Sequence, residues 1–92
     1  MAHTVRDKQQ LLRRLRRARG QLEAVEAALV AEEDCYIILQ TLAACRGALN
    51  GLVAEVIEGH IRFHLVDPEA QPTAPSAQAA QELISIIRSY LK

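Results

Sequence analysis

The sequence has 92 residues, enough for one small domain, and a single copy of that size buries too little surface to be comfortably stable by itself. Half of the residues are hydrophobic but only 3% are aromatic, a composition that favours helices over strands. The formal net charge is zero, and no Ser/His/Asp, phosphate-loop or paired-carboxylate arrangement is present, so an enzyme with a small-molecule substrate is not expected. We expect one all-α domain over residues 1–92, whose apolar surface is covered by other subunits.

The N-terminal segment is polar and charged, without the apolar region of a signal peptide. No apolar run approaches the roughly 20 residues that span a bilayer, so no membrane contact is expected. Cys35 and Cys45 lie ten residues apart on one expected helix, about 15 Å from each other, which is too far for a disulfide. Two reduced cysteines fit a cytoplasmic protein.

The first predicted helix runs from about Thr4 to about Ala31. Thr4 followed by Asp7 resembles a capping box, with Asp in place of the usual Glu. Apolar residues then recur at spacings of three and four, which predicts one buried face. That face consists of Leu11, Leu12, Leu15, Ala18, Leu22, Val25 and Leu29. Gly20 interrupts the helical pattern, and we expect it to mark close packing against another helix.

Basic residues are concentrated near the start of this helix. The first twenty residues contain seven basic residues and one acidic residue, so the rest of the chain carries the compensating negative charge. Such a cluster suits contact with nucleic-acid phosphates. The alternative is a solvated face with salt bridges, but few acidic residues lie nearby in the sequence. We therefore expect contacts to double-stranded DNA from Arg13, Arg14, Arg16, Arg17 and Arg19.

A second helix is predicted after the acidic run of residues 32–34, with Asp34 as its N-cap and Cys35 at its first position. Its apolar pattern continues to about Leu65, which gives a helix of about 30 residues and about 45 Å. The apolar face consists of Ile38, Leu42, Cys45, Leu49, Leu52, Val53, Val56 and Ile57. A helix of this length extends past its partners in the same chain and is a natural dimerisation element.

Residues 66–78 contain three prolines with Ser, Thr and Ala, which predicts a linker. A third helix is expected from about Ala77 to Leu91, with an apolar stripe formed by Leu83, Ile84, Ile87 and Leu91. The chain is therefore expected to form a three-helix protomer with one long central helix.

His60 and His64 are four residues apart, so they project from the same face of a continuous helix. Two imidazoles at this spacing are a recurrent metal-binding arrangement, although a polar rim near a helix end has the same pattern. The residue after His60 is Ile61 and not Glu, so a zinc protease is not indicated.

Cys35 and His60 lie at opposite ends of the long helix, about 37 Å apart. Because metal–ligand bonds are only about 2.0–2.3 Å long, one chain cannot bring both residues to one ion. An antiparallel dimer can, since the start of one long helix meets the end of the other. His3 is a candidate additional ligand on a short N-terminal arm. The alternatives are a partly exposed helix-start cysteine and a disordered terminus, whereas Cys45 is expected to be a buried small hydrophobe.

The segment 42–52 reads Leu-Ala-Ala-Cys-Arg-Gly-Ala-Leu-Asn-Gly-Leu, with Arg19-Gly20-Gln21 upstream and Ser89-Tyr90-Leu91-Lys92 at the end. With Cys35 and His60 at their spacing, these residues resemble the CsoR/RcnR family of bacterial metal- and aldehyde-responsive repressors over essentially the whole chain. The resemblance implies three-helix protomers that pair into antiparallel dimers and then into a disc-shaped tetramer, a dimer of dimers. It also implies binding to operator DNA without a helix-turn-helix, and release of the DNA by an inducer.

The opening residues 3–8, His-Thr-Val-Arg-Asp-Lys, resemble the nickel/cobalt-responsive RcnR branch. The family's copper(I) sensors carry a cysteine at the position of His64, and imidazole there favours borderline divalent metals. The resemblance implies a Ni(II) or Co(II) site, with Zn(II) as a further candidate, formed by His3, Cys35, His60 and His64 and completed by the N-terminal amine. Metal binding would then derepress genes for metal efflux or resistance.

Two alternatives remain open from the sequence. A formaldehyde-responsive repressor would use Cys35 as a nucleophile near the N-terminal amine, although such sensors carry a proline where this chain has Ala2. An interaction module that binds no DNA is the other alternative.

Overall fold

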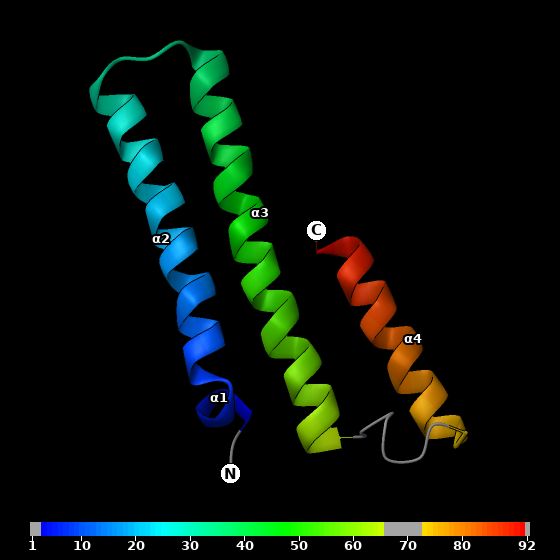
Figure 1. Cartoon of the computed structure of the whole chain (residues 1–92). Helices are drawn as coiled ribbons and strands as arrows, with labels where there is room; N and C mark the ends of the chain where they lie inside the picture. The colour runs from blue at the N-terminus through cyan, green and yellow to red at the C-terminus, as the bar shows by residue number, and fades with distance from the viewer. Residues whose placement is uncertain (1–2, 66–72, 92) are drawn as a thin grey trace.

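In the computed structural model, residues 3–65 and 73–91 are described, and nearly all of them are helical, which confirms the predicted all-α fold. The elements follow in the order α1 (His3–Arg6), α2 (Lys8–Val30), α3 (Cys35–His60), the π-helix η1 (Ile61–Leu65) and α4 (Pro75–Tyr90). Helices α2 and α3 form an antiparallel pair, and α4 runs back along the lower half of α3 (Figure 1). The long central helix predicted from the sequence is α3, extended by η1.

The start of the chain differs from the prediction, because the first helix is divided at Asp7. Thr4 lies inside α1, so the predicted capping box is wrong. Asp7 is the N-cap residue of α2 but makes no side-chain capping hydrogen bond. The C-terminal end of α2 agrees with the prediction, since the helix ends at Val30 with Ala31 as its C-cap.

The connection between α2 and α3 is a tight turn built from the acidic run. Glu32 has φ 55°, in the left-handed region, and its N–H donates to the carbonyl of Leu29 at 3.1 Å. The N–H of Glu33 donates to the carbonyl of Ala28 at 3.0 Å. This pairing satisfies carbonyls at the end of α2 in the manner of a Schellman motif. Asp34 is the N-cap residue and Cys35 the first residue of α3, as predicted.

Helix α4 begins at Pro75, two residues ahead of the predicted start at Ala77. Proline suits a first helical position, because its fixed φ is helical and its missing N–H would have no partner within the helix. Residues 66–72 of the predicted linker lie outside the described residues, and residues 75–78 are helical. A small core anchors α4: Ile61, Ala80 and Ile84, with Ile57 and Ile87 packed against them. Leu83, predicted in the apolar stripe, is exposed instead.

The pairing of α2 with α3 buries small side chains and leaves large ones at the surface. Ala18, Ala28 and Cys45 are buried, and the burial of Cys45 confirms its predicted place in the core. Leucines predicted to lie in the core remain exposed, and they comprise Leu15, Leu22 and Leu29 of α2 and Leu42 and Leu49 of α3. The molecule measures 55 × 25 × 12 Å, and 12 Å is about the diameter of one helix with its side chains. A single layer of helices has no second layer against which both of its faces can be buried.

The helix formed by α3 and η1, residues Cys35–Leu65, is long and apolar enough to cross a membrane by length and composition, with a mean hydropathy of 1.4 in its most apolar window. The expectation that no segment meets this criterion was therefore too strong. The central helix of a helical assembly in water meets the same criterion, so length and composition do not distinguish the two cases. The polar residues along Cys35–Leu65 include Gln40, Arg46, Asn50 and Glu55.

Candidate functional site

The two histidines at the end of the central helix lie close together. His60 is the last residue of α3, and His64 belongs to η1. Their ring centroids are 5.2 Å apart with an interplanar angle of 39°, and both residues are exposed. With metal–nitrogen bonds of about 2.0–2.1 Å, two imidazoles on one ion have ring centres about 4.5–5 Å apart. The ring separation is close to that of two imidazole ligands of one metal ion.

The N-terminal helix packs at the same end of the molecule. Helix α1 contacts α3 (Figure 1), and the guanidinium of Arg6 lies over the ring of Phe63, 4.4 Å from its centroid. Phe63 belongs to η1, between the two histidines in the sequence. The backbone of His3 begins α1. The cation–π contact therefore holds the segment that carries His3 beside the histidine pair.

Cys35 does not join this group. It is the exposed first residue of α3, at the opposite end of a 26-residue helix from His60, which at about 1.5 Å per residue is about 37 Å away. Among the side chains that the structure describes, no three His, Cys, Asp or Glu residues converge to hold a metal ion. Within one chain the two imidazoles thus lie at one end of the central helix and the thiol at the other. The N-terminal amine lies outside the described residues.

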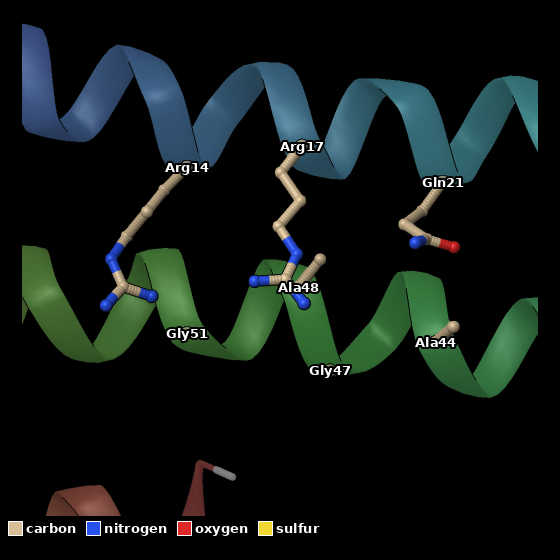
Figure 2. Close-up of a pocket in the computed structure, with 7 residues that line it drawn as sticks. All are labelled: Arg14, Arg17, Gln21, Ala44, Gly47, Ala48 and Gly51. Carbon is tan, nitrogen blue, oxygen red and sulfur yellow. The ribbon is translucent and has the colours of Figure 1, made fainter.

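The five candidate arginines divide into two sets. Arg13, Arg16 and Arg19 are exposed on α2. Arg14 and Arg17 extend from α2 toward α3, and Gln21 lies one turn further along the same side (Figure 2). They line a groove of about 260 Å³ whose other wall is made of small residues of α3. That wall consists of Ala44, Gly47, Ala48 and Gly51.

Within the chain, close packing occurs at Gly51 and not at Gly20. A Cβ built at Gly20 would meet no atom of the same chain within 4 Å, so no described helix of this chain packs closely there. A Cβ at Gly51 would lie 3.1 Å from Nη1 of Arg14. The absence of a side chain at Gly51 lets the guanidinium of Arg14 lie directly on the surface of α3.

Arg14 is also held by an ion pair that was not predicted from the sequence. Nη2 of Arg14 donates to Oε1 of Glu55 at 3.2 Å, and Nη2 of Arg88 donates to the same oxygen at 3.0 Å. Nε2 of Gln10 donates to Oε2 of Glu55 at 3.3 Å. One carboxylate of α3 thus joins residues of α2 and α4. The expectation that acidic residues are too few to pair with the arginines is wrong for Arg14.

The network continues toward the histidines. Arg88 also donates to Glu58, and Arg62 donates to Glu58 at 3.4 Å. The pKa of Arg88 is raised above its ordinary value, chiefly because its guanidinium donates to Glu55 and also because it donates to Glu58. Glu58 and Arg62 have the i,i+4 spacing that indicates a helical ion pair, and this part could have been found in the sequence. No local spacing indicated the contacts of Arg14 and Arg88 with Glu55.

Comparison with known proteins identifies the family. The family profile described as "Metal-sensitive transcriptional repressor" matches residues 7–89. The chain is 48% identical over 92 residues to "Uncharacterized protein in bioA 5'region" of Serratia marcescens, with all of both chains covered. It is 38% identical over 92 residues to "Transcriptional repressor RcnR" of Salmonella paratyphi B, again with all of both chains covered. The chain belongs to the family of metal-sensitive transcriptional repressors.

Proposed function

We propose that this chain is a repressor that binds double-stranded operator DNA and is released from it by Ni(II) or Co(II), with Zn(II) as a further candidate. Release would derepress genes for metal efflux or resistance in the cytoplasm. The observation that carries the choice of a divalent metal is the His60–His64 pair, with ring centroids 5.2 Å apart. Two imidazoles favour borderline divalent ions over Cu(I), which prefers thiolates.

The partner that completes the site is a second copy of the chain. The single layer of helices exposes Leu15, Leu22 and Leu29 at seven-residue intervals along α2. A second exposed row on α3 consists of Leu39, Leu42, Leu49 and Val53. Rows at this spacing are helix-packing surfaces. They support an antiparallel dimer and then a dimer of dimers, in which protein rather than lipid covers the apolar face of α3.

In such a dimer, the exposed thiol of Cys35 from one subunit meets His60 and His64 of the other. The contact between Arg6 and Phe63 supports a place for His3 beside the histidines of its own chain. The metal supplies a bond between groups that belong to two subunits. The described residues then have separate roles: Cys35 is a thiolate donor, the imidazoles are donors on one helix end, and Phe63 orients α1.

DNA contact is assigned to Arg13, Arg14, Arg16, Arg17 and Arg19. Arg13, Arg16 and Arg19 are exposed on α2, and Arg14 and Arg17 line the groove beside it. Several copies of α2 in one assembly multiply these cations, whose affinity for phosphates depends steeply on salt. Metal lowers the affinity for DNA only if it binds the DNA-free arrangement more tightly, and DNA must then weaken metal binding by the same factor. The proposal therefore requires that the arginines have one arrangement in the DNA-bound state and another in the metal-bound state. The change between them must accompany a change in the distance between Cys35 of one subunit and the histidines of the other.

The experiment begins with selection of a binding sequence from a random duplex pool by the metal-free protein. The selected duplex is then titrated with Ni(II), Co(II), Zn(II) and formaldehyde in separate samples, and release is followed by fluorescence anisotropy. Release by Ni(II) or Co(II) supports the proposal. Release by formaldehyde alone replaces it with the aldehyde-responsive alternative, and failure to select any sequence favours an interaction module without DNA binding.

The ligand set is tested by the absorption spectrum of the Co(II) complex. A thiolate ligand gives an intense charge-transfer band, which should disappear in Cys35→Ala. Cys45→Ala is the matched control, because Cys45 is buried between helices and should leave the band unchanged. A band that survives Cys35→Ala and disappears in Cys45→Ala would overturn the assignment.

A further inference from the structure

Glu55 occupies a position that neither the family assignment nor the proposed DNA contacts explain. Its side chain is 16% exposed, and its two oxygens accept hydrogen bonds from Arg14, Arg88 and Gln10. Arg14 and Arg88 share Oε1, and they come from helices on opposite sides of α3 (Figure 1). The carboxylate therefore has two competing cationic partners, one of which lines the arginine groove.

Arg14 is bound loosely enough to be exchanged. Its side chain is 39% exposed, and partly exposed ion pairs contribute little to stability. A guanidinium has five N–H donors, of which the ion pair with Glu55 uses one at Nη2. A phosphate oxygen at the groove would compete with the Glu55 carboxylate for the same cation. The two anions have the same charge sign and similar hydrogen-bonding geometry for a guanidinium.

From this geometry we infer that Glu55 is an internal competitor of DNA phosphate for Arg14, and that Arg88 of α4 sets the strength of that competition. The inference rests on the proposed function, in which Arg14 contacts DNA. When Arg88 holds Oε1, the carboxylate is divided between two cations and Arg14 is more easily released. When Arg88 moves away with α4, Glu55 pairs with Arg14 alone and DNA contact is weakened. The position of α4 thereby regulates the DNA-binding surface.

The placement of Arg88 supports this coupling. It lies one helical turn beyond Ile84, which is 3% exposed and anchors α4 to Ile61 at the start of η1. The same packing that docks α4 therefore brings the Arg88 guanidinium to Glu55. A rearrangement of η1 would move α4 through the contact between Ile61 and Ile84. The movement of α4 would then change how the carboxylate of Glu55 is shared between Arg88 and Arg14.

The test uses Glu55→Gln, which keeps the size of the side chain and removes its charge. The probe is a random-sequence 30-base-pair duplex, because phosphate contacts do not depend on sequence. At 50 mM salt, Glu55→Gln should bind several-fold more tightly than the wild type. Each Arg14 side chain that is freed to contact a phosphate should steepen the dependence of DNA affinity on salt. Between 50 and 200 mM salt the affinity should then fall by a further factor of about three to four. Glu82→Gln is the control for net charge, since Glu82 is an exposed carboxylate on the outer part of α4.

The role of Arg88 is tested by Arg88→Lys, which keeps the charge but shortens the side chain, so that the cation is drawn back from the position of Nη2, where Arg88 donates to both Glu55 and Glu58. This variant should bind DNA more weakly than the wild type, and the difference should vanish when Glu55→Gln is also present. Circular dichroism before each titration identifies a misfolded sample. If Arg88→Lys does not fold, Arg88→Gln is compared instead, in the wild-type protein and in the Glu55→Gln variant. If Glu55→Gln and Glu82→Gln bind the duplex with equal affinity, the inference about Glu55 is overturned and the proposed function is unaffected. If neither the wild type nor any variant binds the duplex, the proposed function is overturned as well.

Discussion

Ile84→Ala and Ile86→Ala test whether α4 is held by one face. The two residues have the same type, lie on the same helix and are two positions apart, but Ile84 is 3% exposed and Ile86 is 53% exposed. Each substitution removes three carbon atoms, worth about 0.8 kcal/mol apiece when fully buried. At Ile84 the loss of transfer free energy and the small cavity predict about 2–3 kcal/mol of destabilisation. At Ile86 partial burial and the better helix propensity of Ala leave less than about 1 kcal/mol.

The assay is thermal unfolding followed by circular dichroism at one fixed protein concentration, because the stability of an oligomer depends on concentration. For a chain of this size, 1 kcal/mol corresponds to about 4–8 °C in Tm. Ile84→Ala should therefore lower Tm by about 10–20 °C, and Ile86→Ala by no more than a few degrees. If Arg88 acts through Glu55, Ile84→Ala should also weaken DNA binding at temperatures where the protein is folded.

Equal destabilisation by the two substitutions would refute the argument. It would mean that Ile86 is covered as completely as Ile84 in the assembled protein, so that the exposed face of α4 is an interface. A smaller effect at Ile84 than at Ile86 would mean that the core of Ile61, Ala80 and Ile84 does not anchor α4.

Four further outcomes are expected. Gly20→Ala should stabilise the protein by about 0.8–1 kcal/mol in thermal unfolding, because a Cβ at this position meets no atom of the chain. Gly51→Ala should stabilise it less, because the new Cβ would lie 3.1 Å from Nη1 of Arg14, and the difference should disappear when Arg14→Gln is also present. Replacing Glu32, at φ 55°, with Gly should raise Tm by a few degrees, because glycine adopts this conformation without strain; a lower Tm would contradict the turn geometry. Arg17→Gln should reduce the slope of log K against log salt by about 0.9 for each copy that contacts DNA, and an unchanged slope would remove Arg17 from the interface. Phe63→Leu should weaken binding of Ni(II), measured by calorimetry, because Arg6 of α1 loses its cation–π contact with the ring of Phe63, and wild-type affinity would show that this contact does not position the N-terminal segment.

Much of the fold could be predicted from the sequence, because the relevant signals are local. The end of α2 at Val30 and the start of α3 at Cys35 follow from the acidic run and the helix periodicity. The proximity of His60 and His64 follows from their four-residue spacing, and η1 keeps them close. The break at Asp7 was not predicted, because helix propensity is continuous across it, whereas the contacts of α1 with α3 and η1 are tertiary.

The faces of the helices could be predicted less well. Periodicity marks a face as apolar but does not say whether the same chain or another copy covers it. Leu15 and Ala18 both fit the predicted stripe of α2, yet Ala18 is 3% exposed and Leu15 is 48% exposed. The close pairing of α2 with α3 selects small residues for its interface, so the larger leucines are left exposed.

By itself, the sequence determined the helical segments, the concentration of arginines on the first long helix, and the separation of Cys35 from His60 by the length of one helix. These features depend only on residue type and on the geometric repeat of a helix. The tertiary structure decided that Arg14 and Arg17 line a groove against α3, and that Glu55 is shared between Arg14 and Arg88. Arg14 and Arg88 lie 41 and 33 residues from Glu55, and their meeting there depends on how three helices pack side by side.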